Sequence, residues 1–481
     1  MLAKSNLITS SLDSSNPLAM DDSAATTTFH GGAGSADSSG AHVLLLPFPG
    51  MQGHANPMLQ LGHRLAYHGL SPTLVVSRHV LSTTTASTSC PFPVAAISDG
   101  FDTGGLASCP DAAEYSRRME AAGSETLAAL LDSEARVGRR VRVLVYDSHL
   151  PWARRVACDA GVAAAAFLTQ MCAVDLIYGE VWAGRSTLPG IRLAVELGPD
   201  DVPPFVAAPR WYPAFTESAL SQFDGLELAD DVLVNSFRDL EPMEADYLES
   251  TWRAKTIGPT LPSFYLDDGR LPSNRTYGFN LFSSSAAPCM AWLNNQEPCS
   301  VLLASYGTVA NLDTVQLEEL GNGLCDSGKP FIWVLRSDEE EKLSEELGGR
   351  CKERGLIVPF CPQLEVLAHE ATGCFLTHCG WNSTIESIVT GVPMVAMPRW
   401  ADQPTAAKYV ESAWGIGLRM RKGLVRREEV ERCIREVMDG ERKQEYRRIA
   451  AKWMQKAKEA MQEGGTSDKN IAEFAAKYLS K

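Results

Sequence analysis

The segment from Phe360 to Gln403 carries residues suited to binding a diphosphate. Thr377 ends an apolar run that we expect to form a strand, and Gly380-Trp-Asn-Ser-Thr384 then turns into a predicted helix. The first amides of a helix lack acceptors within the helix and lie at the positive end of its dipole, so they bind phosphate oxygens. Nearby side chains could add hydrogen bonds to the phosphates or to a ribose; these are His378, Asn382, Ser383 and Glu386.

An imidazole and a carboxylate in the first part of the chain could perform acid–base chemistry. His54 follows the predicted strand His42–Pro47 and precedes Asn56, where we expect a helix to begin. Asp147 follows another predicted strand, Val141–Tyr146. Parallel-sheet proteins bind ligands at the carboxyl ends of their strands, so the two side chains could converge there. His54 could then take a proton from a hydroxyl while Asp147 holds the ring's tautomer and stabilises its charge.

Residues that often bind zinc also occur around the predicted diphosphate site; these are His369, Cys374, His378 and Cys379. Adjacent residues on a strand point to opposite faces, and these four lack the spacing of a closed set of ligands. The chain also contains no Asp-x-Asp tripeptide to hold a metal-bridged diphosphate. We therefore predict that the protein has no metal site and works without a metal.

The segment from Phe360 to Gln403 resembles the signature box of the plant family 1 UDP-dependent glycosyltransferases. That box usually opens with W-x-P-Q, carries H-C-G-W-N-S near its middle and closes with D-Q. Shorter matches to the family occur at Asp99-Gly-Phe-Asp102, Val234-Asn-Ser-Phe237, Ile257-Gly-Pro259 and Ser305-Tyr-Gly-Thr308. The resemblance therefore covers nearly everything after residue 40.

The resemblance implies contacts between this box and a nucleotide sugar. Phe360 would stack on the uracil, and Gln363 would lie near the ribose. Trp381, Asp402 and Gln403 would contact the sugar. Phe360 replaces the family's usual Trp, so its smaller aromatic face predicts somewhat weaker nucleotide affinity. Gln403 resembles the glucose-preferring members of the family.

The resemblance also implies roles outside the box. His54 and Asp147 match the family's catalytic dyad, and Thr308 occupies a position that faces the diphosphate or the sugar. The four polar residues near the predicted helix start keep the phosphate and ribose roles argued above.

The predicted elements around these residues give an α/β fold. Continuous apolar runs, typical of strands buried in a parallel sheet, alternate with helical patterns. The predicted strands are 42–47, 73–76, 141–145, 231–235, 300–305, 330–335, 374–377 and 394–397. The family resemblance implies the GT-B architecture, in which two Rossmann-like, doubly wound domains face each other across a cleft.

We predict the following domain organisation. Residues 1–40 are a disordered extension, because they are rich in Ser, Ala, Thr, Gly and Asp. Residues 41–252 form the acceptor-binding domain, and 253–285, which are crowded with Pro and Gly, form the linker. Residues 286–457 form the UDP-sugar domain, and the helix at 458–481 crosses back to the first domain.

Composition excludes some classes of partner. The net charge of −15 argues against a nucleic-acid surface, because binding a polyanion requires clustered Lys and Arg. The 12 scattered cysteines favour free thiols in a reducing compartment, and no apolar stretch reaches the length of a membrane span. We expect a cytoplasmic monomer that binds neither nucleic acid nor membrane.

These observations predict an inverting O-glucosyltransferase that uses UDP-glucose as co-substrate and needs no other cofactor. A G-x-G-x-x-G dinucleotide fingerprint after the first strand and a G-x-S-x-G hydrolase elbow are both missing. A catalytically silent UDP-sugar-binding protein is the alternative from a different class.

The expected acceptor is a small, mostly apolar alcohol. The stretches His149–Trp152 and Ile177–Arg185, with an apolar helix predicted from about Gly161, resemble the cereal branch that glucosylates trichothecenes as well as phenolics. A trichothecene such as deoxynivalenol is the leading candidate. Flavonoids, benzoates and hormones are the alternatives.

Overall fold

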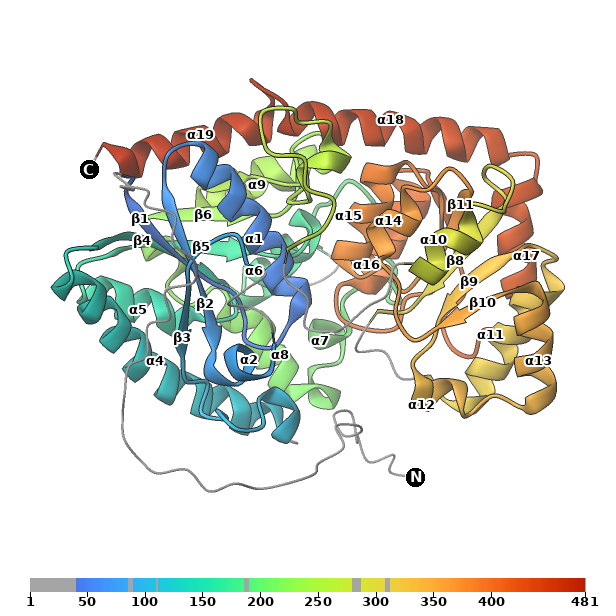
Figure 1. Ribbon diagram of the computed structural model, residues 1–481, viewed down its shortest axis with the longest axis horizontal. Helices are drawn as coiled ribbons and strands as arrows, with labels where there is room; N and C mark the ends of the chain where they lie inside the picture. Colours follow the sequence, from blue (N-terminus) through green and yellow to red (C-terminus); the bar gives the residue numbers. More distant parts are fainter. Residues whose placement is uncertain are drawn as a thin grey trace. The chain divides into compact units, whose positions relative to one another are not determined.

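The computed structural model describes residues 40–84, 90–109, 111–185, 190–278, 287–307 and 312–480. The described strands form two sheets that are accompanied by helices (Figure 1). The strand order in both sheets is that of an α/β fold, because consecutive parallel strands are joined through helices.

The first sheet has the strand order β3-β2-β1-β4-β5-β6-β7. Its strands are β1 (His42–Leu46), β2 (Ser71–Ser77), β3 (Val94–Ile97), β4 (Val141–Asp147), β5 (Ala163–Leu168), β6 (Asp231–Val234) and β7 (Ala254–Thr256). β1 pairs in parallel with both β2 and β4, so that Leu45 lies opposite Leu74 on one side and Val145 on the other. The order therefore reverses between β1 and β4, and such a switch point is where open α/β sheets bind ligands.

The helices of this part of the chain are α1 (Gln52–Tyr67), α2 (Arg78–Thr83), α4 (Ala112–Arg136), α5 (Pro151–Asp159), α6 (Cys172–Trp182), α7 (Pro204–Ala207), α8 (Pro213–Ser221) and α9 (Pro242–Trp252). Short 3-10 helices occur at Leu106–Ser108, Pro209–Trp211, Leu226–Leu228 and Ser263–Leu266. α1 follows β1 directly, and α6 follows β5 after a short loop.

The second sheet has the order β10-β9-β8-β11-β12-β13, with its switch point between β8 and β11. Its strands are β8 (Val301–Ser305), β9 (Phe331–Val334), β10 (Gly355–Val358), β11 (Thr372–Thr377), β12 (Met394–Ala396) and β13 (Gly417–Arg419). Its helices are α10 (Ala287–Leu293), α11 (Thr314–Asp326), α12 (Ser337–Glu340), α13 (Glu345–Arg354), α14 (Gln363–Leu367), α15 (Trp381–Thr390), α16 (Gln403–Ser412), α17 (Arg427–Asp439), α18 (Lys443–Met461) and α19 (Thr466–Leu479). Alternate strand residues such as Leu302, Trp333 and Leu376 form a core with α11, α13 and α17.

Three predicted helix starts differ from the structure. The C-terminal helix predicted at 458–481 begins only at Thr466, because α18 continues to Met461 and Gly464, with a positive φ of 79°, separates the two helices. α1 begins at Gln52 rather than at Asn56, because the His54 and Ala55 amides already donate to the Met51 carbonyl. The predicted apolar helix from about Gly161 is wrong, since Ala163–Leu168 is the strand β5 and the helix begins at Cys172. Alanine favours helices in isolation, but its small side chain fits a strand covered on both faces.

The chain divides into two compact units. Unit 1 comprises Met1–Ala166, Tyr277–Leu281 and Ala475–Lys481, and unit 2 comprises Phe167–Thr276 and Phe282–Phe474. β7 falls inside the segment 253–285 that was predicted as a linker, so the first sheet continues beyond residue 252.

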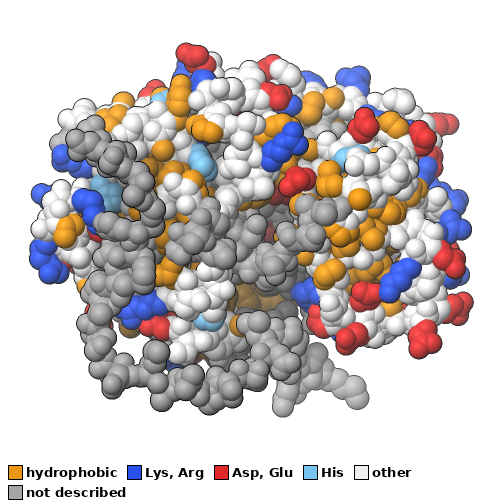
Figure 2. Space-filling model, in the orientation of Figure 1, with side chains coloured by type: hydrophobic (Ala, Val, Ile, Leu, Met, Phe, Trp, Pro, Cys, Tyr) orange, Lys and Arg blue, Asp and Glu red, His pale blue; other side chains and the backbone are white. Residues whose placement is uncertain are grey.

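Two structural features concern the nucleic-acid and membrane partners that the sequence argues against. On the face drawn in Figure 2, the described acidic and basic side chains are interspersed. No helix in the described part of the chain combines the length and the apolar character that crossing a bilayer requires. The twelve cysteines are free thiols, as predicted.

Candidate active site

His54 and Asp147 meet in unit 1, as the sequence predicts. His54 lies in the first turn of α1, and Asp147 is the last residue of β4. The ring Nδ1 of His54 lies 2.6 Å from Asp147 Oδ2. The Asp147 side chain is 0% exposed, whereas the His54 side chain is 20% exposed. The carboxylate is therefore buried, whereas the imidazole is partly exposed and accessible to a ligand.

The environment of Asp147 keeps it ionised. Burial by itself would raise the pKa of Asp147, but the charge of His54 and the hydrogen bonds from His149 and His54 together hold this pKa below its ordinary value. An ionised carboxylate accepts a hydrogen bond from the Nδ1–H group, which keeps its proton, so Nε2 is the basic nitrogen of His54. A general base whose ring is oriented by a neighbouring carboxylate has this arrangement.

A second imidazole contacts the same carboxylate. His149 Nδ1 lies 3.2 Å from Asp147 Oδ1, and the His149 amide donates to the same oxygen at 3.1 Å. The rings of His54 and His149 lie edge to face, with centroids 5.4 Å apart. The sequence analysis placed His149 in an acceptor stretch and missed this contact. Its signal was a histidine two residues after a strand-ending aspartate.

These three residues also form a group that could hold a cation. One ligand atom from each of His54, Asp147 and His149 lies within 4.8 Å of the others, and no further such group occurs among the described residues. The zinc candidates weighed from the sequence, around His378, therefore do not assemble in the described chain. The hydrogen bonds to Asp147 give both imidazoles a role that needs no metal.

The predicted diphosphate cradle lies in unit 2, where α15 starts at Trp381 after Gly380. Cys379 has the left-handed backbone angle φ of 64°, which is unusual for a residue with a side chain. The Trp381 amide donates to Asp402 Oδ2 at 3.1 Å, and the Thr384 amide donates to the Gly380 carbonyl at 3.0 Å. The start of the helix is thus held by Asp402, a residue predicted to contact the sugar.

His378 lies directly before this turn and is enclosed by glycines. A Cβ atom on Gly307 would come within 2.9 Å of the ring, and one on Gly380 within 2.5 Å. Burial lowers the pKa of His378 to about 4, so its ring is neutral at physiological pH. A hydrogen bond with the Ser305 backbone opposes this effect of burial. A phosphate oxygen of a ligand would supply a further partner for this ring.

Three further predicted residues form one cluster. Gln363 begins α14, and its side-chain amide donates to Ser383 Oγ at 3.0 Å and to Glu386 Oε2 at 2.7 Å. Ser383 and Glu386 are buried in the first two turns of α15. The structure therefore brings together the residues predicted to contact the ribose and the phosphates.

The remaining predicted residues are placed as follows. Gln403 begins α16, and its side-chain oxygen accepts the amides of Arg399 at 2.9 Å and Trp400 at 3.2 Å. Phe360 is half-buried after β10, and Asn382 is the second residue of α15. Thr308 lies outside the described residues.

The Trp381 indole has a structural partner. Its Nε1 donates to the Asn235 carbonyl at 2.7 Å, directly after β6. The side-chain oxygen of Asn235 accepts the amide of Thr260 at 3.1 Å and its hydroxyl at 2.7 Å. The family-like motif at 234–237 therefore contacts Trp381 directly, and the Ile257 and Gly258 amides of the motif at 257–259 donate to the Val234 and Ser236 carbonyls at 2.9 Å.

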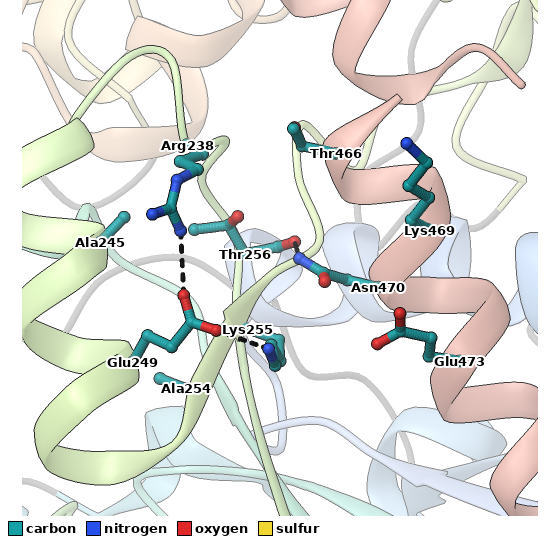
Figure 3. Close-up of a pocket in the computed structure, with 10 residues that line it drawn as sticks. All are labelled: Arg238, Ala245, Glu249, Ala254, Lys255, Thr256, Thr466, Lys469, Asn470 and Glu473. Atoms are coloured by element: carbon teal, nitrogen blue, oxygen red, sulfur yellow. Dashed lines mark hydrogen bonds and ion pairs between the residues drawn. The ribbon is translucent and has the colours of Figure 1, made fainter. Parts of the chain in front are cut away.

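A pocket of about 200 Å³ lies elsewhere in unit 2, between α9, β7 and α19 (Figure 3). It contains none of the predicted site residues. Glu249 in its wall pairs with Arg238 at 2.9 Å and with Lys255 at 2.6 Å. Because none of the predicted site residues lines it, the pocket is not part of the proposed chemistry.

The chain is similar to known proteins over most of its length. The family model "UDP-glucoronosyl and UDP-glucosyl transferase" matches residues 281–452. UDP-glycosyltransferase 79 of Oryza sativa subsp. japonica is 69% identical over 92% of this chain and 98% of its own. UDP-glucosyltransferase UGT13248 of Hordeum vulgare subsp. vulgare is 66% identical over 94% of this chain and 96% of its own.

A solved structure matches as well. The crystal structure of Os79 from O. sativa in complex with UDP and deoxynivalenol-3-glucoside is 66% identical, with a TM-score of 0.84, over 91% of this chain and 100% of that one. This similarity confirms the GT-B fold that the sequence predicts.

Proposed function

This chain belongs to the UDP-glycosyltransferase family, and from this premise we propose that it is an inverting, UDP-glucose-dependent O-glucosyltransferase of small, mostly apolar alcohols. The observation that carries the proposal is the 2.6 Å contact between His54 and the buried Asp147. A UDP-sugar-binding protein without activity has no need of an oriented base. The dyad therefore favours catalysis over silent binding.

The proposed reaction is a single displacement. His54 Nε2 takes the proton of the acceptor hydroxyl, and the oxygen attacks the anomeric carbon of UDP-α-glucose. The bond from that carbon to the phosphate oxygen breaks, and UDP leaves with the electron pair. Attack from the face opposite the leaving group inverts the centre, so the product is a β-glucoside. Asp147 stabilises the imidazolium that forms.

The first turn of α15 and His378 stabilise the departing diphosphate in this proposal, with Thr308 as a further contact. Amides at a helix start bind anions without a metal. A neutral imidazole can donate one hydrogen bond to a phosphate oxygen. We therefore propose that the enzyme needs no metal, and loss of activity in a chelator that added metal restores would contradict this.

A trichothecene alcohol such as deoxynivalenol is the proposed acceptor. Support comes from the rice relative Os79, whose crystal structure contains deoxynivalenol-3-glucoside. Flavonoids, benzoates and hormones remain the alternatives to be compared directly.

The proposal is tested by incubating the protein with UDP-glucose and a panel of these acceptors. We expect UDP release together with the mass increase of one hexose on the acceptor, and the largest kcat/KM for deoxynivalenol. UDP-galactose in place of UDP-glucose should give slower transfer, because Gln403 resembles the glucose-preferring residue. Binding of UDP-glucose without turnover of any acceptor would contradict the proposal.

A further inference from the structure

The aromatic ring of Phe48 lies beside the imidazoles of His54 and His149. Phe48 belongs to the loop between β1 and α1. Its ring centroid is 5.7 Å from that of His54 and 6.3 Å from that of His149, and the two imidazole centroids are 5.4 Å apart. The three rings are therefore neighbours of one another, although the proposed reaction gives Phe48 no task.

These rings share the side of the group from which an acceptor can approach. Asp147 is fully buried behind them, whereas the side chains of His54 and His149 are 20% and 15% exposed. Phe48 is also partly exposed. An acceptor hydroxyl must come within about 3 Å of His54 Nε2 to give up its proton. The carbon atoms next to that hydroxyl then lie close to the Phe48 ring, because the rings of Phe48 and His54 are neighbours.

Tyr115 supports the Phe48 ring. Tyr115 is buried, and its ring centroid lies 6.3 Å from that of Phe48. Its hydroxyl donates to Asp99 Oδ2 at 3.0 Å, which fixes the position of the Tyr115 ring. A contact that is already held in place loses little conformational freedom when a ligand binds. Phe48 therefore offers the acceptor a preformed apolar surface.

Phe48 also borders a small hollow of about 10 Å³ in unit 1. Three buried valines line its inner part; these are Val75, Val76 and Val80. Gly50 and Met51, which are more exposed, lie at its rim. The oxygen of Ser77, the polar side chain in its wall, accepts the Val80 amide at 3.3 Å. A hollow of this size holds about one small group, and its apolar lining favours a methyl group over water.

We propose that Phe48 and this hollow form the part of the acceptor site next to the base. The carbon skeleton beside the attacking hydroxyl packs on the Phe48 ring, and a small apolar group near that hydroxyl enters the hollow. The inference rests on the proposed function. It narrows the acceptors to alcohols and phenols that carry a group of about methyl size close to the reacting hydroxyl.

The first test replaces Phe48 with leucine, which keeps an apolar side chain but removes the ring. For Phe48→Leu we expect the KM of the best acceptor to rise about three- to tenfold, the usual effect of a lost aromatic contact. The Kd for UDP should stay within about twofold of wild type. The pH profile of kcat should be unchanged, because the base stays in place.

Phe92→Leu is the matched control. Phe92 is also partly exposed, and its ring centroid lies 5.0 Å from that of His63, an imidazole of α1 that the mechanism does not use. This variant should keep the wild-type acceptor KM. An unchanged acceptor KM in Phe48→Leu, an equal rise in both variants, or a loss confined to kcat with a shifted pH profile would each overturn the proposal.

The second test examines the hollow with two acceptors that differ by one methyl group, phenol and 2-methylphenol. The wild type should favour 2-methylphenol about three- to fourfold in kcat/KM, the effect of burying one methyl group. Val80→Ile adds a methylene group to the wall of the hollow, so it should abolish this preference. Its rate of transfer to phenol should stay within about twofold of wild type, which also shows that the variant is folded.

The outcomes of the second test are distinct. No preference for 2-methylphenol in the wild type, or the same preference in Val80→Ile, would contradict the role of the hollow. A wild-type protein that transfers glucose to no acceptor would overturn the proposed function, and this inference with it.

Discussion

At the scale of single residues, the contact between the two proposed catalytic side chains could be predicted because each follows a strand in a parallel sheet. His54 and Asp147 meet at 2.6 Å although 93 positions separate them. The contact of His149 was not predicted, because its position two residues after Asp147 does not fix which way its ring turns. In the structure both rings contact Asp147, His54 at Oδ2 and His149 at Oδ1.

We expect His149→Ala to weaken activity far less than loss of His54. His149 donates to Asp147 Oδ1, so its removal leaves the bond from His54 to Oδ2 in place. The predicted loss in kcat is under about tenfold, against about 10²- to 10⁴-fold for removing a general base. Steady-state rates with UDP-glucose and the best acceptor measure it. A larger loss in His149→Ala than in His54→Ala would assign the base to His149.

His378 predicts a pH dependence of stability. Its pKa falls from 6.5 in the unfolded chain to about 4 in the folded protein, so the folded state binds fewer protons between these values. The stability contributed by the neutral ring is present above pH 6.5 and is lost as the pH falls towards 4. The loss amounts to at most about 3 kcal/mol, and to less where solvent reaches the ring.

The measurement is the free energy of unfolding by urea at pH 7 and pH 5 for the wild type and for His378→Gln. The variant lacks the titrating ring, so its stability should fall less than that of the wild type between these pH values. Equal falls in the two proteins would contradict the prediction.

At the scale of elements, strands with long runs of large apolar residues were predicted. Strands that are short or made of small residues were not. β8 and β11 are continuous apolar runs with β-branched or aromatic residues, and both were predicted. β7 has three residues and β5 begins with four alanines, so neither gives a strand signal alone. Their pairing partners in the sheet decide their conformation.

At the start of α15, we expect the single methyl group added by Gly380→Ala to weaken UDP binding. Gly380 has φ of −60° and ψ of 146°, which alanine adopts freely, but a Cβ there would lie 2.5 Å from His378 Nε2. Gly380→Ala should therefore displace the imidazole and raise the Kd for UDP about tenfold or more, as expected when a charge-assisted hydrogen bond is lost. Calorimetric titration with UDP measures this.

Gly348→Ala is the control for this change. Gly348 lies inside α13, and a Cβ there would meet nothing within 4 Å. The control should bind UDP as the wild type does and gain about 0.5–1 kcal/mol of stability, because alanine favours a helix. If Gly380→Ala bound UDP normally, the close contact with His378 would have no role in the nucleotide site.

At the scale of the whole molecule, the family and the GT-B fold could be predicted because the signature box has many residues at fixed spacing. The domain boundary was harder, since β7 occupies part of the breaker-rich segment and the division into units falls within β5. Packing between elements distant in sequence decides such domain boundaries. A segment rich in Pro and Gly indicates only a local break in regular structure. The acceptor could not be derived from residues, because its pocket depends on side-chain shape.

The most direct test of the account separates catalysis from nucleotide binding in His54→Ala. We predict that glucose transfer to the best acceptor falls by about 10²- to 10⁴-fold while the Kd for UDP stays within about twofold of wild type, because His54 is the proposed base and the proposed nucleotide contacts lie in unit 2. Transfer at the wild-type rate in His54→Ala would contradict the account.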